Sequence, residues 1–205
     1  MKIEATYCTP KEGRDLKILG SGKLLKVAEL CNGRELRAWG KTESEGSGPK
    51  RIGSYVGPMD CQGETLRLEL ELEDSENLAM LFEGCLQLKS VDSIGQTGAA
   101  KSFSWMFAGC QSLKEAPRLD TSKGENFTSM FESCQSLERV PELDTRSGEN
   151  FSWMFAYCSS LKGAPRLDTR NGENFSSMFH GCESLERAPD YALKPQAKKQ
   201  KQNED

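Results

Sequence analysis

Hydrophobic residues recur along this chain with one fixed spacing, which is the strongest signal in the sequence. In the stretch NFSWMFAYCSSL, counted from Phe151, apolar side chains stand at positions i, i+3, i+4 and i+7. This spacing is typical of the inner stripe of a short amphipathic helix. The same phrase begins at Phe103, Phe127 and Phe175, so the period is 24 residues, and a degenerate copy begins near Leu78. We therefore expect one short helix in each of these copies.

The residues that follow each expected helix indicate a short strand and then a turn. In one copy, Pro117 cannot continue a helix because proline has no backbone N–H. Leu119 then fits an extended segment, and Asp120 and Thr121 are typical of turns. A helix–strand–turn unit of this size cannot bury its own apolar face, so stacked copies should share one continuous core.

An asparagine stands directly before three of the expected helices, at Asn126, Asn150 and Asn174. Its side chain can accept a hydrogen bond from an N–H group at a helix start. Each asparagine also begins an N-glycosylation sequon, but capping explains these residues without a sugar.

The phrase NFxxMFxxCxSLxxxPxLDT resembles the BspA-type leucine-rich repeats of bacterial surface proteins, especially the variety found in mycoplasma lipoproteins. The resemblance covers roughly residues 76–191. It implies an α/β fold, a leucine-rich-repeat-like solenoid with short parallel strands on one side and helices on the other. It also implies protein binding, often adhesion, and it carries over no catalytic residues. This sequence departs from the exported members because it shows no leader and no lipidation cysteine, and its array is short.

The chain outside the array divides into two further regions. Residues 1–75 do not repeat, and we expect them to form an N-terminal β-rich cap. Within it, Glu64–Asp74 alternates leucine with charged residues, as a half-buried strand does, and should be the first rung of the solenoid. The array itself, residues 76–191, holds about four to five copies of 24–25 residues. Residues 192–205 are polar and are expected to be a disordered tail.

Composition and charge limit the kinds of partner and the cellular location that we expect. The 205 residues are 36% hydrophobic and 28% charged, a globular balance, and the net charge of −4 argues against a nucleic-acid partner. No signal peptide and no apolar run long enough to span a bilayer is visible, so we expect a cytoplasmic protein, whereas the resemblance suggests the cell surface.

Candidate chemistry is sparse, and we expect neither an enzyme nor a cofactor. Five of the eight cysteines recur at one slot of the repeat without a close CxxC pair, which favours buried thiols over disulfides or zinc ligands. The recurring Asp120, Asp144 and Asp168 could line up for calcium, but the adjacent threonine and glycine favour turns. The one histidine, His180, occupies a variable slot, and no catalytic set surrounds it in the sequence.

The variable positions alternate in charge between copies. Two slots read positive, negative, positive, negative: Lys114, Glu138, Lys162 and Glu186, and then Arg118, Glu142, Arg166 and Asp190. On stacked strands each charge would lie between opposite charges, which favours correct register. A self-compensating surface is therefore preferred to a charged binding site.

A second alternation involves aromatic residues. The slot two positions after the first phenylalanine reads Trp105, Ser129, Trp153, Ser177, and on a helix it lies about 200° from that phenylalanine, facing outward. Tyr157 shares this outward side. Tryptophan and tyrosine are favoured at binding hot spots. The candidate partner-binding residues are therefore Trp105, Trp153, Tyr157 and His180; the alternative is that the N-terminal region or the tail covers the aromatic rings.

These observations favour a non-catalytic module that binds another protein through the variable outer positions of the solenoid. One setting is neutralisation of a toxin or effector, as an immunity protein does, for which acidic charge and free thiols are suitable. Alternatives are a surface adhesin module, as the resemblance suggests, and a structural self-assembling repeat in which tryptophans meet across a homo-oligomer.

Overall fold

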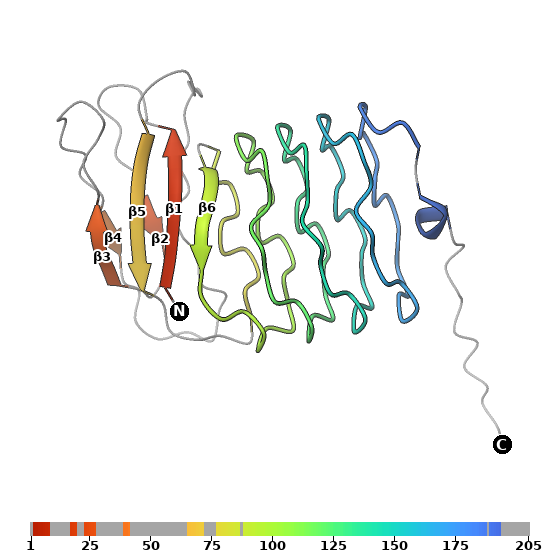
Figure 1. Cartoon of the computed structure of the whole chain (residues 1–205), viewed down its shortest axis with the longest axis horizontal. Helices are drawn as coiled ribbons and strands as arrows, with labels where there is room; N and C mark the ends of the chain where they lie inside the picture. Colours follow the sequence, from red (N-terminus) through yellow and green to blue (C-terminus); the bar gives the residue numbers. More distant parts are fainter. Residues whose placement is uncertain are drawn as a thin grey trace.

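The computed structural model of the chain describes residues 2–8, 17–19, 23–27, 39–41, 65–71, 77–86, 88–187 and 189–193. The regular elements of this part are β1 (Lys2–Cys8), β2 (Lys17–Leu19), β3 (Lys23–Val27), β4 (Trp39–Lys41), β5 (Thr65–Glu71), β6 (Leu88–Ile94) and the 3-10 helix η1 (Asp190–Leu193). In Figure 1 the strands gather at one end, and a row of coils leads away from β6 toward the C-terminus.

The N-terminal strands form a four-stranded sheet in the order β3-β5-β1-β6, and all neighbouring pairs are antiparallel. Strands β2 and β4 pair separately and in parallel. The expected strand at Glu64–Asp74 is β5, but it pairs with β1 and β3 and not with the repeats. The repeats join the sheet through β6, which pairs with β1. The expected burial of one side of β5 concerns side chains outside the described residues.

Proline explains why β6 is a full strand and its counterparts in later copies are not. The β6 sequence LKSVDSI has no proline, so each residue can offer its N–H to a ladder. At the corresponding place the next copy carries Pro117, and only the isolated parallel bridge Glu115↔Arg139 remains there. The sheet therefore ends at the first copy, and the later copies are joined by other hydrogen bonds.

Each later copy forms one coil, a name we use for the path of one 24-residue repeat. Every second N–H in the segment 103–109 donates to a carbonyl of the next coil; Phe103 donates to Asn126 at 2.9 Å and Phe107 to Met130 at 2.9 Å. The same bonds continue at Phe127, Phe151 and their neighbours. Parallel bridges join Ser102, Asn126, Asn150 and Asn174 in sequence. Successive copies therefore lie side by side.

Turns occupy the places where helices were expected. In an α-helix each N–H bonds four residues back within its own segment. Here Met106 donates to the carbonyl of Phe103, three residues back, while the N–H of Trp105 bonds to the next coil. Trp105 and Gly109 have φ of 60° and 75°, the sign that the third residue of a type II turn requires. Residues 77–86 and 88–187 contain no α-helix, so the helical part of the expectation does not describe this region.

The repeated apolar residues fill the interior of the coils. Two stacks of phenylalanine rings run along the array, with neighbouring centroids 5.1–5.6 Å apart and nearly parallel planes; one holds Phe103, Phe127, Phe151 and Phe175, and the other Phe82, Phe107, Phe131, Phe155 and Phe179. The repeat cysteines lie beside them as free thiols, buried except for the partly buried Cys182. Each of Cys110, Cys134, Cys158 and Cys182 donates its thiol to a phenylalanine carbonyl of the preceding coil. The sequence prediction of buried thiols outside disulfides is confirmed for Cys85, Cys110, Cys134 and Cys158.

The residues at the corner before each turn segment have local roles. The side-chain oxygen of Asn126 accepts a hydrogen bond from the N–H of Thr128 at 3.0 Å, and Asn150 and Asn174 repeat this contact. Gly124 is required for another reason: a Cβ there would lie 2.4 Å from the ring of Phe127. The asparagines therefore satisfy backbone donors as expected, although the segment that they begin is a turn.

Candidate functional site

Three of the four candidate aromatic and imidazole residues lie together on the surface. The ring centroids are 6.4 Å apart for Trp153 and Tyr157, 6.0 Å for Trp153 and His180, and 5.2 Å for Tyr157 and His180. Trp153 and Tyr157 are 36% and 42% exposed, and His180 is exposed as well. We call these three residues the aromatic cluster. The alternative expectation, that the N-terminal region or the tail covers the aromatic rings, falls mostly on residues outside the described ranges and stays a prediction.

Trp105 lies in the same slot as Trp153, two coils earlier, and is 37% exposed. It makes no ring contact within the described part of the chain. Ser129, in the slot between the two tryptophans, is only 2% exposed, whereas Ser177 in the last coil is exposed. Trp105 is therefore a separate exposed ring on the same row and not a member of the cluster.

The backbone beneath the cluster is in a conformation that L-residues with side chains rarely adopt. Trp153 has φ of 59° and Tyr157 has φ of 61°. The left-handed region costs a non-glycine residue about 1–2 kcal/mol. In the slot of Tyr157 the other coils carry Gly84, Gly109, Ser133 and Gly181. A large aromatic side chain therefore occupies a position that the fold fills more easily with glycine.

The last coil positions the tyrosine ring. The N–H of Tyr157 donates to the carbonyl of His180 at 2.6 Å, which places its Cα against that coil. A Cβ on Gly181 would lie 2.7 Å from Cδ1 of Tyr157, so only glycine there leaves the ring this close approach. His180 then meets the tyrosine ring edge-on. The cluster is thus built from two neighbouring coils whose relative position is fixed by backbone bonds.

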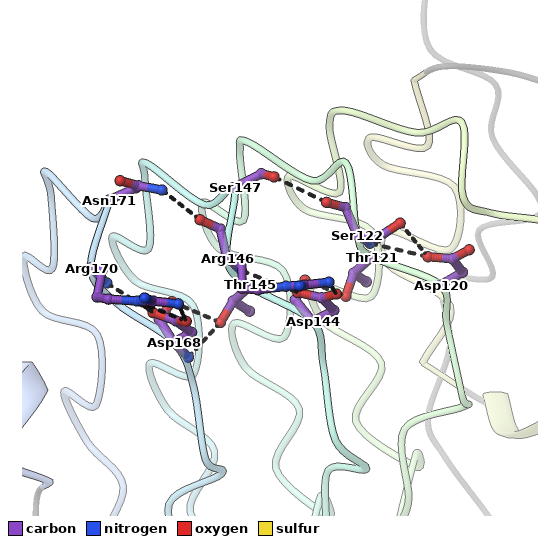
Figure 2. Close-up of polar contacts among 10 residues, drawn as sticks. All are labelled: Asp120, Thr121, Ser122, Asp144, Thr145, Arg146, Ser147, Asp168, Arg170 and Asn171. Atoms are coloured by element: carbon purple, nitrogen blue, oxygen red, sulfur yellow. Dashed lines mark hydrogen bonds and ion pairs between the residues drawn. The ribbon is translucent and has the colours of Figure 1, made fainter.

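The Asp–Thr pairs form a second ordered row, shown in Figure 2. Arg146 donates to the carboxylate of Asp144 at 2.6 Å, and Arg170 to Asp168 at 2.6 Å. These hydrogen bonds are the largest cause that lowers the pKa of both carboxyl groups, to about 2 for Asp168. Each carboxylate is engaged by the second residue after it, as the turn interpretation requires.

The threonines of this row join one coil to the next. Thr121 Oγ1 donates to the carbonyl of Asp144 at 2.8 Å, and Thr145 Oγ1 to that of Asp168 at 2.9 Å (Figure 2). Nowhere in the described ranges do three or more His, Cys, Asp or Glu side chains gather as metal ligands would. The repetition of Asp–Thr in successive coils is therefore explained by the turns that the pair forms and by the hydrogen bonds that join one coil to the next.

A groove with a volume of about 1020 Å³ crosses three coils beside these turns. Its lining includes Leu143, which is buried, and the exposed side chains of Arg118, Glu142 and Arg166. A second hollow of about 550 Å³ adjoins it, and the two share Glu115 and Pro141 in their linings. The two hollows form one continuous surface that the sequence alone did not reveal.

Charge compensation between coils is only partial. Lys162 and Glu138 form an ion pair at 3.8 Å, as the alternation predicted. Arg118, Glu142 and Arg166 alternate in the same way, yet none of them forms an ion pair or a side-chain hydrogen bond within the described residues. The groove is thus bordered by charges that no residue in the described part of the chain neutralises.

The buried thiols are poor nucleophiles. Burial raises the pKa of Cys110 well above its ordinary value and is also the main cause of the raised pKa of Cys134. A thiolate is the reactive form of cysteine, so these groups stay protonated and inert at neutral pH.

The sequence of the coils identifies the family. A family described as "Mycoplasma protein of unknown function, DUF285" matches residues 75–192, more than half of the chain. The chain belongs to DUF285. The DUF285 match includes every coil, the aromatic cluster and the groove, and it begins after β5. No curated protein and no solved structure matches the chain. In the described part of this DUF285 chain, no helix has the length and apolar character needed to cross a membrane. The finer likeness to BspA-type leucine-rich repeats stays a prediction.

Proposed function

We propose that this chain is a non-catalytic protein-interaction module that binds a macromolecular partner through the variable outer positions of a repeat solenoid. The observation that carries the proposal is the exposed aromatic cluster of Trp153, Tyr157 and His180, in which Trp153 and Tyr157 have left-handed backbone. Trp105 extends the contact surface along the same row.

The physical argument combines residue type, strain and rigidity. Tryptophan and tyrosine contribute most at interfaces because their large flat rings bury much area at a small entropic cost. Tyr157 occupies a slot where glycine would relieve backbone strain, so its retention favours a role outside folding. Backbone bonds between coils hold Tyr157 and His180 in place before any partner arrives. Such preorganisation lowers the entropic cost of association.

Neutralisation of a toxin or effector, in the manner of an immunity protein, is the setting that we favour. The net charge of −4 suits a basic partner, since complementary charge speeds encounter. Free, buried thiols suit the reducing cytoplasm, where we place the protein. The alternative of a surface adhesin module is supported by the resemblance of the repeats to BspA-type leucine-rich repeats. A structural self-assembling repeat, in which tryptophans meet across a homo-oligomer, is the third alternative.

The test uses substitutions that the chain itself already carries at equivalent slots. Trp153→Ser copies Ser129 and Ser177, and Tyr157→Gly copies Gly109 and Gly181. The double variant should keep the wild-type circular dichroism spectrum and urea midpoint but capture its specific partner from lysate of the source organism at least about tenfold less well. Trp105→Ser is the matched control outside the cluster and should weaken capture less.

Mass spectrometry of the captured proteins separates the settings. A small basic toxin encoded beside this chain supports neutralisation, and a host or surface ligand supports the adhesin alternative. Equal capture of every specific partner by wild type and double variant would reject the aromatic cluster as the binding site.

A further inference from the structure

The unpaired charges along the groove follow a strict order. Arg118, Glu142 and Arg166 stand in successive coils as positive, negative, positive. Asp190, which lies 24 residues after Arg166 at the start of η1, continues the alternation as a fourth, negative member. The first three have no charged or hydrogen-bonding partner for their side chains in the described part of the chain, and Asp190 pairs only with the exposed Arg187, at 3.3 Å. These charges are therefore available to another molecule.

A second row runs parallel to the first and has the same phase. Lys114, Glu138, Lys162 and Glu186 alternate in the same four coils. Between the two rows lies a strip whose small and apolar members include Ala116, Val140, Pro141, Ala164 and Pro165. The same strip carries Glu115 and Arg139, which pair with each other at 3.6 Å. We call the two charged rows and this strip the alternating face.

The row of four charges reads positive, negative, positive, negative. When its order is reversed, every position carries the opposite charge, so the row is complementary to a reversed copy of itself. If a second copy faces the first about a twofold axis that passes between the coils of Glu142 and Arg166, Glu142 lies opposite Arg166 of the second copy. The same axis places Arg118 opposite Asp190 and, in the other row, Glu138 opposite Lys162. Every charged contact in both rows is then between opposite charges, and each occurs twice, as an isologous interface requires.

From this self-complementarity we infer that the alternating face binds a second copy of the chain in an antiparallel, twofold dimer. This surface uses different slots from the aromatic cluster, so the inference is independent of the proposed function.

The spacing of the charges favours a second copy over other occupants. The ring centroids of equivalent residues in successive coils lie about 5.4 Å apart, as between Phe107 and Phe131. An extended peptide presents side chains on one face only about every 6.6–6.8 Å, so it would lose register within a few coils. A uniformly charged partner such as a nucleic acid would meet repulsion at every second coil. Another array of the same coils keeps both spacing and sign.

Charge reversal with mixing tests the geometry directly. Glu142→Arg places two arginines opposite each other in a homodimer, and Arg166→Glu places two glutamates opposite each other. In a one-to-one mixture, however, each variant offers the charge that the other needs at both symmetric contacts. Sedimentation equilibrium of the full chain should show a dimer for wild type, dimerisation weakened by about tenfold or more for each variant alone, and a restored dimer for the mixture.

The controls address folding and net charge. Glu149 is exposed, lies outside both hollows and forms no ion pair with another described residue. Glu149→Arg therefore changes the net charge as Glu142→Arg does and should dimerise as wild type does. Should either main variant lose its circular dichroism spectrum, a mixture of Arg118→Glu with Asp190→Arg tests the outer contacts of the same axis.

The inference is overturned by any of three results. These are a wild-type chain that stays monomeric up to about 1 mM, single variants that dimerise as wild type does, or a mixture that associates no better than its components. A monomer would assign the alternating face to some other occupant.

Discussion

Replacing Phe131 by alanine should destabilise the array more than any change on its surface. Phe131 is fully buried, and its ring stacks between Phe107 at 5.4 Å and Phe155 at 5.6 Å with nearly parallel planes. Phe179, at the end of the same stack, provides a matched comparison. It is partly buried and has one stacked neighbour, Phe155, and a tilted contact with Tyr191.

The expected magnitude follows from burial and stacking. A buried phenylalanine truncated to alanine costs about 3–5 kcal/mol through lost apolar contact and the cavity left behind. Two stacked pairs, each contributing about 0.5–1.5 kcal/mol, place Phe131→Ala in the upper half of that range. Phe179→Ala removes less buried area and one stacked pair, so we expect about 2 kcal/mol. Since whole domains are stable by only about 5–15 kcal/mol, the difference is measurable.

Urea unfolding followed by circular dichroism, with reductant present to keep the thiols free, measures both free energies. Comparable m-values for wild type and variants would show that the same surface is exposed on unfolding. A cost for Phe131→Ala below about 1.5 kcal/mol, or one no larger than that for Phe179→Ala, would show that the ring stack does not form the core of the array.

Three further predictions concern single groups. Thiol labelling of native protein should modify the half-buried Cys182 before Cys134. Cys134 should react only after denaturation, because burial raises the pKa of its thiol and blocks access of the reagent. Equal labelling rates would contradict the placement of Cys134 in the core. Because the folded pKa of Asp168 is about 2, below the ordinary carboxyl value, its ion pair should contribute stability above about pH 4 that is lost as pH falls toward 2. Arg170→Ala should raise that pKa in an NMR titration, and an unchanged value would exclude the ion pair as its cause. Tyr157→Gly should cost less than about 1 kcal/mol in urea unfolding, because relief of the left-handed backbone offsets the lost ring contacts, and a cost of 3 kcal/mol would place the ring in the core.

The sequence was sufficient to identify which residues are interior but not the backbone that presents them. The spacing i, i+3, i+4, i+7 places Phe103, Met106, Phe107 and Cys110 on one side of a helix, and it does the same for consecutive four-residue turns. Hydrophobic periodicity therefore cannot distinguish the two. The glycines could have distinguished a helix from turns. Gly109 and its counterparts Gly84 and Gly181 lie in the middle of the expected helices, where glycine costs about 1 kcal/mol of stability.

The candidate site was predictable in part for the same reason. Trp153 faces outward on a helix wheel, and it also does so at the third position of a turn. Its exposure could therefore be predicted from an assumed helix, although the segment is a turn. The contact of Tyr157 with His180 could not be found this way, because it joins neighbouring coils through a backbone bond between them. The sequence also did not reveal that Arg118, Glu142 and Arg166 form no ion pairs with one another. Sequence order fixes which charges are neighbours, but it does not fix whether the side chains reach one another, as Glu138 and Lys162 do and Arg118 and Glu142 do not.

The internal bonding of the coils explains why so much of the surface is free to vary. Hydrogen bonds between coils come from backbone groups, from thiols and from the Asp–Thr turns, and the rings stack inside. None of these contacts uses the side chain of Trp153 or of Arg166, so substitutions there leave the forces that stack the coils intact. A regular pattern in slots that stacking does not constrain then needs another cause. For tryptophan alternating with serine, and for charges alternating over four coils, contact with another molecule is a cause that depends on both residue type and order.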